Sequence, residues 1–186
     1  MDDNKFLEKC VKKAYKINKA FWNFDIKFNV RSVLTRKDMD KEWEGKTQKW
    51  MVAFAWNKKL IIFAPSVYEK LGCHKLESYQ DTVTHEMNHL FYQKFVGTYK
   101  PLWLSEGLAT NIQKEMNIKI KKINPDFLLY TEKGWHKKSY EHSYLAVKLL
   151  LDKLGKKKLL HLLKKYSKSP KKDNYTKLFG PYLKVF

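Results

Sequence analysis

The sequence predicts an α+β fold, with a small antiparallel or mixed sheet followed by a mostly helical C-terminal half. Two stretches, 24–33 and 48–56, have side chains that alternate with the two-residue period of a half-buried strand. From residue 76 onward, apart from an irregular stretch at 117–135, apolar residues recur every three or four positions, as in helices packed on a core. The chain has 186 residues and no internal repeat or long linker, so we expect a single domain over residues 1–186.

An amphipathic helix is predicted first, over residues 4–22. Asp2, Asp3 or Asn4 can cap its first turn. Its apolar residues recur at spacings of three and four, with lysines between them: Phe6, Cys10, Ala14, Ile17 and Phe21.

Three strands are expected next. Residues 24–33 alternate apolar and polar side chains, and residues 48–56 alternate large and small ones. A charged segment between them, 36–45, predicts a short surface helix or a loop. Residues 57–59 can turn the chain into a short apolar strand, 60–64, which forms a hairpin with the strand before it.

Helices dominate from residue 65 onward. A short helix is expected from Pro65 to the stop at Gly72. A long helix over residues 76–96 follows and ends at Gly97. Pro101 is a suitable first-turn residue for the next helix, which is predicted to reach about residue 116.

The last third of the chain predicts two more helices, 139–154 and 156–166, which Gly155 separates. A short apolar segment, 175–186, ends the chain and is interrupted at Gly180-Pro181.

The strongest functional motif is His85-Glu86-Met87-Asn88-His89, a His-Glu-x-x-His pattern in the predicted helix 76–96. Histidines four residues apart project from one helix face, so both imidazoles can bind one metal ion. Glu86 lies about 100° round the helix from His85, where it can act as general base toward a water molecule that the metal activates. We therefore predict a site for one Zn²⁺ ion. Asp81, one turn earlier, is either a hydrogen-bond acceptor for a ligand histidine or a surface carboxylate.

A catalytic zinc ion needs a third protein ligand, and Glu106 is the candidate. His89 precedes the predicted stop at Gly97 by eight residues, a rise of about 12 Å. Glu106 follows Pro101 by five residues, a rise of about 8 Å. If these two helices are antiparallel neighbours, the Glu106 carboxylate returns close to the level of the histidines, so the spacing is compatible with a third ligand.

His85-Glu86-x-x-His89 followed by Trp103-Leu104-Ser105-Glu106-Gly107-Leu108-Ala109 resembles the gluzincin metallopeptidases. The residues are most similar to the aminopeptidase N-like branch and its small single-domain relatives, the peptidase MA-like proteins and minigluzincins. The resemblance covers roughly residues 48–166 and implies a zincin (thermolysin-like) catalytic domain. It also implies His85, His89 and Glu106 as the zinc ligands.

A second segment, Tyr140-Glu141-His142-Ser143, resembles the Tyr-Glu-Lys-Gly segment of the aminopeptidase branch. Because the tyrosine of that segment supports the oxyanion of the tetrahedral intermediate, the resemblance implies this role for Tyr140. The alternative is that Tyr140 packs in the core. In that case Tyr144 and His142 are the other candidates for the residue that supports the oxyanion.

The chain also departs from these families. The Gly-Ala-Met-Glu-Asn segment that recognises a free substrate N-terminus is absent, and Met-Val-Ala-Phe-Ala at 51–55 stands in its expected place. Thr110 occupies the position at which thermolysin-type enzymes carry an acidic residue, one turn after the ligand Glu. We therefore expect a zinc-dependent endopeptidase acting on a peptide or protein substrate, with an aminopeptidase as the alternative. The substrate is expected to pair with the edge of strand 48–56 or 60–64.

The net charge of +19 comes from 38 basic residues, of which only Arg31 and Arg36 are arginine. Specific recognition of phosphates and bases favours the bidentate guanidinium, so this lysine excess predicts no specific nucleic-acid partner. Non-specific attraction to nucleic acid or anionic surfaces at low salt follows from the charge in any case.

Two other classes of function remain open. One is a catalytically idle or latent metal-binding module, with residues 182–186 covering the cleft. The other is a basic surface or nucleic-acid-binding protein with a vestigial zinc site. Structural zinc sites usually fill all four positions and prefer Cys, whereas this set leaves one position open and retains Glu86, which favours an enzyme.

The sequence shows no sign of membrane insertion or export. No apolar run approaches the roughly 18 residues of a membrane span, and no signal-type apolar core follows the acidic N-terminus. Cys10 and Cys73, without Cys-x-x-Cys spacing, are expected to be free thiols in a reducing compartment. We therefore expect a cytoplasmic protein. We also expect a monomer.

Overall fold

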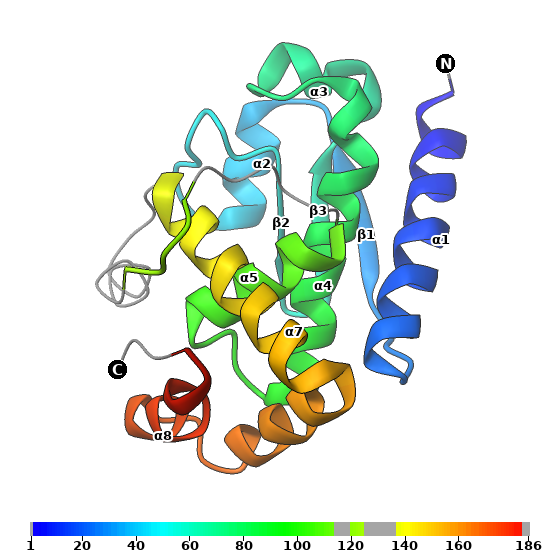
Figure 1. Cartoon of the computed structure of the whole chain (residues 1–186). Helices are drawn as coiled ribbons and strands as arrows, with labels where there is room; N and C mark the ends of the chain where they lie inside the picture. The colour runs from blue at the N-terminus through cyan, green and yellow to red at the C-terminus, as the bar shows by residue number, and fades with distance from the viewer. Residues whose placement is uncertain (1, 114–119, 125–136, 184–186) are drawn as a thin grey trace. The chain divides into compact units, whose positions relative to one another are not determined.

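The computed structural model describes residues 2–113, 120–124 and 137–183 (Figure 1). Over these residues the fold is α+β, mostly helical with a small three-stranded sheet, as the sequence predicts. The chain forms two compact units, Met1–Leu90 and Phe91–Phe186, and the boundary falls within the helix α4 (Tyr79–Val96). The expectation of one domain over residues 1–186 stays a prediction.

The first unit begins with α1 (Asp3–Trp22). Asp2 caps this helix, because its carboxylate accepts hydrogen bonds from the backbone N–H groups of Asn4 (3.1 Å) and Lys5 (3.2 Å). Phe6, Ile17 and Phe21, expected on the core face, are only half-buried. The residues of α1 that are buried are instead Cys10, Ala14, Asn18 and Trp22.

The sheet consists of β1 (Asn29–Val33), β2 (Ala53–Trp56) and β3 (Lys59–Phe63) in the order β1-β3-β2. The central strand β3 pairs parallel with β1 and antiparallel with β2. Asn57 and Lys58 join β2 to β3, both with positive φ (48° and 61°), as a type I′ hairpin turn requires. The predicted small mixed sheet and its hairpin are confirmed.

Two strands are shorter than the sequence predicts. β1 starts at Asn29 and not at residue 24, because Asn29 lies opposite Lys59, the first residue of β3, so the preceding residues have no β3 partner. β2 starts at Ala53 and not at residue 48. On the predicted strand 48–56, Val52 and Phe54 are buried, while Trp50 and Trp56 are 46% and 47% exposed.

Arg36 explains the late start of β2. Its guanidinium donates hydrogen bonds to the carbonyl oxygens of Gln48 (3.1 Å), Met51 (2.6 Å) and Leu71 (2.5 Å). The guanidinium also lies over the Phe63 ring, 4.6 Å from its centroid. These bonds occupy the carbonyl oxygens of Gln48 and Met51, so these groups are not available to a sheet ladder. The Val52 carbonyl, directly before β2, still accepts a hydrogen bond from the backbone N–H of Phe63 in β3 (3.1 Å).

Three helices complete the first unit. α2 (Arg36–Trp43) occupies the charged segment, and α3 (Pro65–Leu71) ends before Gly72, both as predicted. The short 3₁₀ helix η1 (Leu76–Ser78) leads directly into α4.

The second unit contains α5 (Leu102–Gln113), α7 (Lys137–Ser167) and α8 (Lys172–Leu183). α7 is broken at Gly155, where φ is 68°, so the predicted separation of two helices at this glycine is confirmed. Gly180-Pro181, by contrast, lies inside α8 and does not interrupt it. Within the described residues, no helix is long and apolar enough to cross a membrane. Cys10 and Cys73, both in the first unit, are free thiols.

α5 and α7 approach each other closely at Gly107. A Cβ atom at this position would lie 2.3 Å from the carbonyl oxygen of Ser143 and 2.5 Å from Cγ2 of Val147. Close by, the Asn111 side-chain amide donates a hydrogen bond to the carbonyl oxygen of Tyr144 (3.0 Å). The glycine therefore sets the distance between these two helices.

We expect Gly107→Ala to destabilise the chain by about 2–3 kcal/mol, because one of the colliding atoms belongs to the α7 backbone and cannot rotate away. The measurement is the midpoint of urea unfolding of the full chain. Gly45→Ala is the matched control, because its Cβ would meet only Trp43 Cδ1 at an ordinary 3.6 Å. Equal midpoints for the two variants would contradict the close approach.

Candidate metal site

His85, Glu86 and His89 come together on α4, in the part that belongs to the first unit. Each offers a ligand atom, and these atoms lie within 4.8 Å of one another. The imidazole centroids of His85 and His89 are 4.9 Å apart, with the rings at 79°. All three side chains are half-buried. In the described part of the chain, no other three His, Cys, Asp or Glu residues form such a group.

The donor set of this group fits a divalent transition metal. Imidazole nitrogen and carboxylate oxygen are both ligands of zinc, and the i, i+4 spacing places the two imidazoles on one helix face. The same donors also bind other first-row divalent metals, such as cobalt and nickel. The group can therefore bind a metal ion, and zinc is the ion that the sequence motif predicts.

Two tyrosine hydroxyls attach α4 to the rest of the first unit. Tyr79 donates a hydrogen bond to the carbonyl oxygen of Phe63 in β3 (2.9 Å). Tyr68 of α3 shares a hydrogen bond with the hydroxyl of Thr82 (2.6 Å), one turn before Glu86. These contacts hold the start of α4 against β3 and α3.

Tyr68 is also electrostatically coupled to the site. Burial raises the pKa of the Tyr68 hydroxyl, hydrogen bonds from Thr82 and Ser78 lower it, and the carboxylates of Glu86 and Asp81 raise it further. The net shift is upward, so Tyr68 stays neutral beside the site. Asp81, half-buried on α4, is one turn before His85, and its role toward a ligand histidine stays a prediction.

Glu106 lies in the second unit, on α5, where its side chain is only 7% exposed. Carboxylates are rarely so buried unless they are paired or bind a metal. The Thr110 hydroxyl donates to the backbone carbonyl of Glu106 (2.8 Å). Trp103, one turn before Glu106, is fully buried. Its ring centroid lies 6.2 Å from the ring centroids of both Tyr175 and Phe179 in α8. The Glu106 turn is thus held inside the second unit.

The second unit also contains Tyr140 and the two other candidates for supporting the oxyanion, Tyr144 and His142. Tyr140 is half-buried in the first turns of α7, whereas Tyr144 is buried where α5 meets α7. His142 is 5% exposed, and its Nδ1 accepts a hydrogen bond from the backbone N–H of Asn124 (3.2 Å). Burial lowers the pKa of His142, so the ring is neutral with its proton on Nε2. Of the three candidates, Tyr140 is the one with an accessible side chain.

Comparisons with protein-family models, with curated proteins and with solved structures find no match to this chain. The resemblance to gluzincins therefore depends on the motif residues themselves. The zincin fold and membership of a gluzincin family stay predictions.

Proposed function

We propose that this chain is a zinc-dependent peptidase of the gluzincin type, acting on peptide or protein substrates. The observation that carries the proposal is the group of His85, Glu86 and His89, whose ligand atoms lie within 4.8 Å of one another on one helix. Structural zinc sites usually have four ligands and prefer Cys. Neither Cys10 nor Cys73 belongs to this group, so the donor set favours a catalytic ion over a structural one.

Each residue has a defined role in this proposal. His85 and His89, with Glu106 as the predicted third ligand, would hold the ion, which when bound would lower the pKa of water and polarise the substrate carbonyl. Glu86 accepts a proton from the attacking water and delivers it to the leaving amine nitrogen. The Tyr140 hydroxyl donates a hydrogen bond to the substrate oxygen as negative charge develops there, an interaction worth about 3 kcal/mol.

The sheet topology favours β2 as the place where substrate binds. β3 is paired on both sides, so strand 60–64, one of the two predicted candidates, has no free edge for a peptide. β2 is an edge strand, and an extended peptide can add to such an edge through main-chain hydrogen bonds. Trp56, the last residue of β2, and Trp50, three residues before its start, expose apolar surface that can contact substrate side chains.

The missing N-terminus recognition segment favours an endopeptidase. Residues 51–55 include the start of β2, and they contain no carboxylate that could bind a substrate ammonium group. An aminopeptidase is the alternative within the same class. A latent or idle metal-binding module and a basic nucleic-acid-binding protein are the alternatives outside it.

A peptide-library cleavage profile tests the proposal. The full chain is incubated with free and N-terminally acetylated peptides, with and without a zinc chelator. We expect internal cleavage of acetylated peptides that stops with chelator and returns with added zinc. Cleavage of free peptides only would indicate an aminopeptidase. A chain that binds zinc but cleaves neither set would be an idle or latent module.

A further inference from the structure

Two rows of side chains face each other where α1 contacts α4 in the first unit. Within each row the residues are four positions apart, one helical turn. The Gln80 side-chain amide donates to the carbonyl oxygen of Cys10 (3.2 Å), and Asn18 contacts α4 further along the chain. The two helices therefore run in the same direction (Figure 1). The rows are Cys10, Ala14 and Asn18 on α1, and Gln80, Thr84 and Asn88 on α4.

Asn18 holds one turn of α4 at both ends. Its amide nitrogen donates to the carbonyl oxygens of Ala14 (3.0 Å) and Thr84 (3.1 Å). Its amide oxygen accepts a hydrogen bond from the side chain of Asn88 (3.0 Å). Asn18 and Asn88 are both fully buried. The turn between Thr84 and Asn88 contains His85 and Glu86, and His89 follows it directly.

We infer that Asn18 is a positioning residue for the His-Glu-x-x-His turn. His85 and His89 each follow a residue that Asn18 contacts, so their side chains project about 100° further round the helix. A rotation or a slide of α4 on α1 would move both imidazoles together, and the hydrogen bonds of Asn18 oppose both motions. The inference rests on the proposed metal site.

Packing alone does not account for a polar pair at this place. Two apolar side chains of similar shape would fill the same space without any polar group to desolvate. The polar pair even leaves Asn88 Oδ1 buried without a hydrogen-bond partner among the described residues. Buried polar pairs of this kind can specify one register between two helices, whereas apolar pairs tolerate several.

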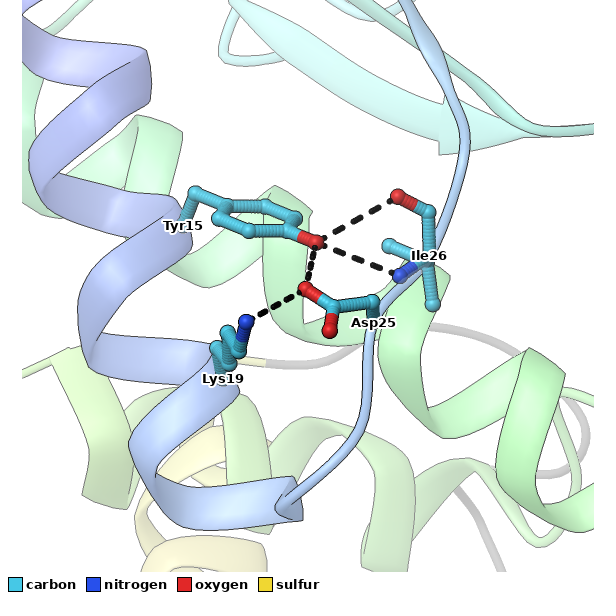
Figure 2. Close-up of polar contacts among 4 residues, drawn as sticks. All are labelled: Tyr15, Lys19, Asp25 and Ile26. Carbon is cyan, nitrogen blue, oxygen red and sulfur yellow. Dashed lines mark hydrogen bonds and ion pairs between the residues drawn. The ribbon is translucent and has the colours of Figure 1, made fainter.

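A second attachment of α1 provides a control (Figure 2). The Tyr15 hydroxyl donates a hydrogen bond to the Asp25 carboxylate (2.7 Å) and accepts one from the backbone N–H of Ile26 (3.3 Å). Lys19 forms an ion pair with the same carboxylate (2.8 Å). These contacts join α1 to the segment before β1, and not to α4.

The test uses the full chain with three variants: Asn18→Leu, the double variant Asn18→Leu/Asn88→Leu, and Tyr15→Phe. Two quantities are measured for each: the zinc dissociation constant by competition with a chromophoric chelator, and the urea midpoint of the metal-free chain. The first reports the geometry of the site, and the second reports folding.

We expect Asn18→Leu to weaken zinc binding about tenfold, the lower end of the effect of residues that orient metal ligands. The double variant should regain most of the urea midpoint, because both hydrogen-bonding partners are replaced together. Its zinc affinity should stay low, because the apolar pair no longer fixes the register. Tyr15→Phe should leave the zinc affinity unchanged.

Recovery of both quantities in the double variant would overturn the inference, because Asn18 would then serve folding only. Wild-type zinc affinity in Asn18→Leu would overturn it as well. If Asn18→Leu does not fold, the zinc affinity of the double variant alone tests the inference: low affinity supports it, and wild-type affinity overturns it. A wild-type chain that binds no zinc would instead refute the proposed function, so the two failures are distinguishable.

Discussion

The Glu86→Gln variant is expected to keep its zinc and to lose peptide hydrolysis by a factor of about 10²–10⁴, the usual contribution of a general base. Glutamine has the same shape as glutamate and preserves the packing of α4, but its amide cannot accept the proton of the attacking water. The measurements are kcat/KM on a peptide chosen from the library and the zinc content of the purified variant.

Glu77→Gln is the matched control, since it removes the same charge from an exposed position just before α4. We expect it to retain wild-type activity. Full activity in Glu86→Gln would exclude Glu86 as the base. Loss of zinc from Glu86→Gln would indicate that Glu86 is a ligand, a role that its place within the group also permits.

The Glu106→Ala variant is expected to weaken zinc binding by more than about 100-fold, because even residues that only orient metal ligands contribute 10–100-fold. Two histidines alone hold zinc poorly, since catalytic sites have three protein ligands. The measurement is chelator competition, together with the urea midpoint of the metal-free variant to account for any loss of folding.

Thr110→Ala provides the control for this variant. Thr110 is buried one turn after Glu106 and contacts its backbone carbonyl, so its loss perturbs the same part of α5 without removing a carboxylate. The Thr110→Ala variant should bind zinc with the affinity of the wild type. Unchanged affinity in Glu106→Ala would place the third ligand elsewhere, with Glu86 and Asp81 as the next candidates.

The features predicted correctly from the sequence are those that short stretches of chain determine. Gly155 breaks α7 because it adopts a positive φ that most residues avoid. Asn57 and Lys58 form the hairpin turn between two apolar segments. The His85 and His89 pair follows from the helical repeat, because the i, i+4 spacing places two imidazoles on one face wherever the helix forms.

The features that were wrong or missed depend on residues distant in the sequence. The start of β2 depends on Arg36, whose hydrogen bonds to the preceding segment have no local signal. In the sequence Asn18 is a polar residue among the lysines of α1, and only its contacts with Thr84 and Asn88 show that it faces α4. The ligand role of Glu106 likewise depends on how α5 is placed relative to α4, which no local pattern determines, so it stays a prediction.

Metal analysis of the purified wild-type chain tests the central claim most directly. The chain is prepared with zinc in excess, dialysed to remove unbound metal, and analysed by elemental mass spectrometry. The proposed zinc site, with His85 and His89 as ligands and Glu106 as the predicted third ligand, predicts one zinc ion per chain, which a strong chelator removes. A folded chain that retains no zinc would contradict the metal site and the proposed peptidase with it.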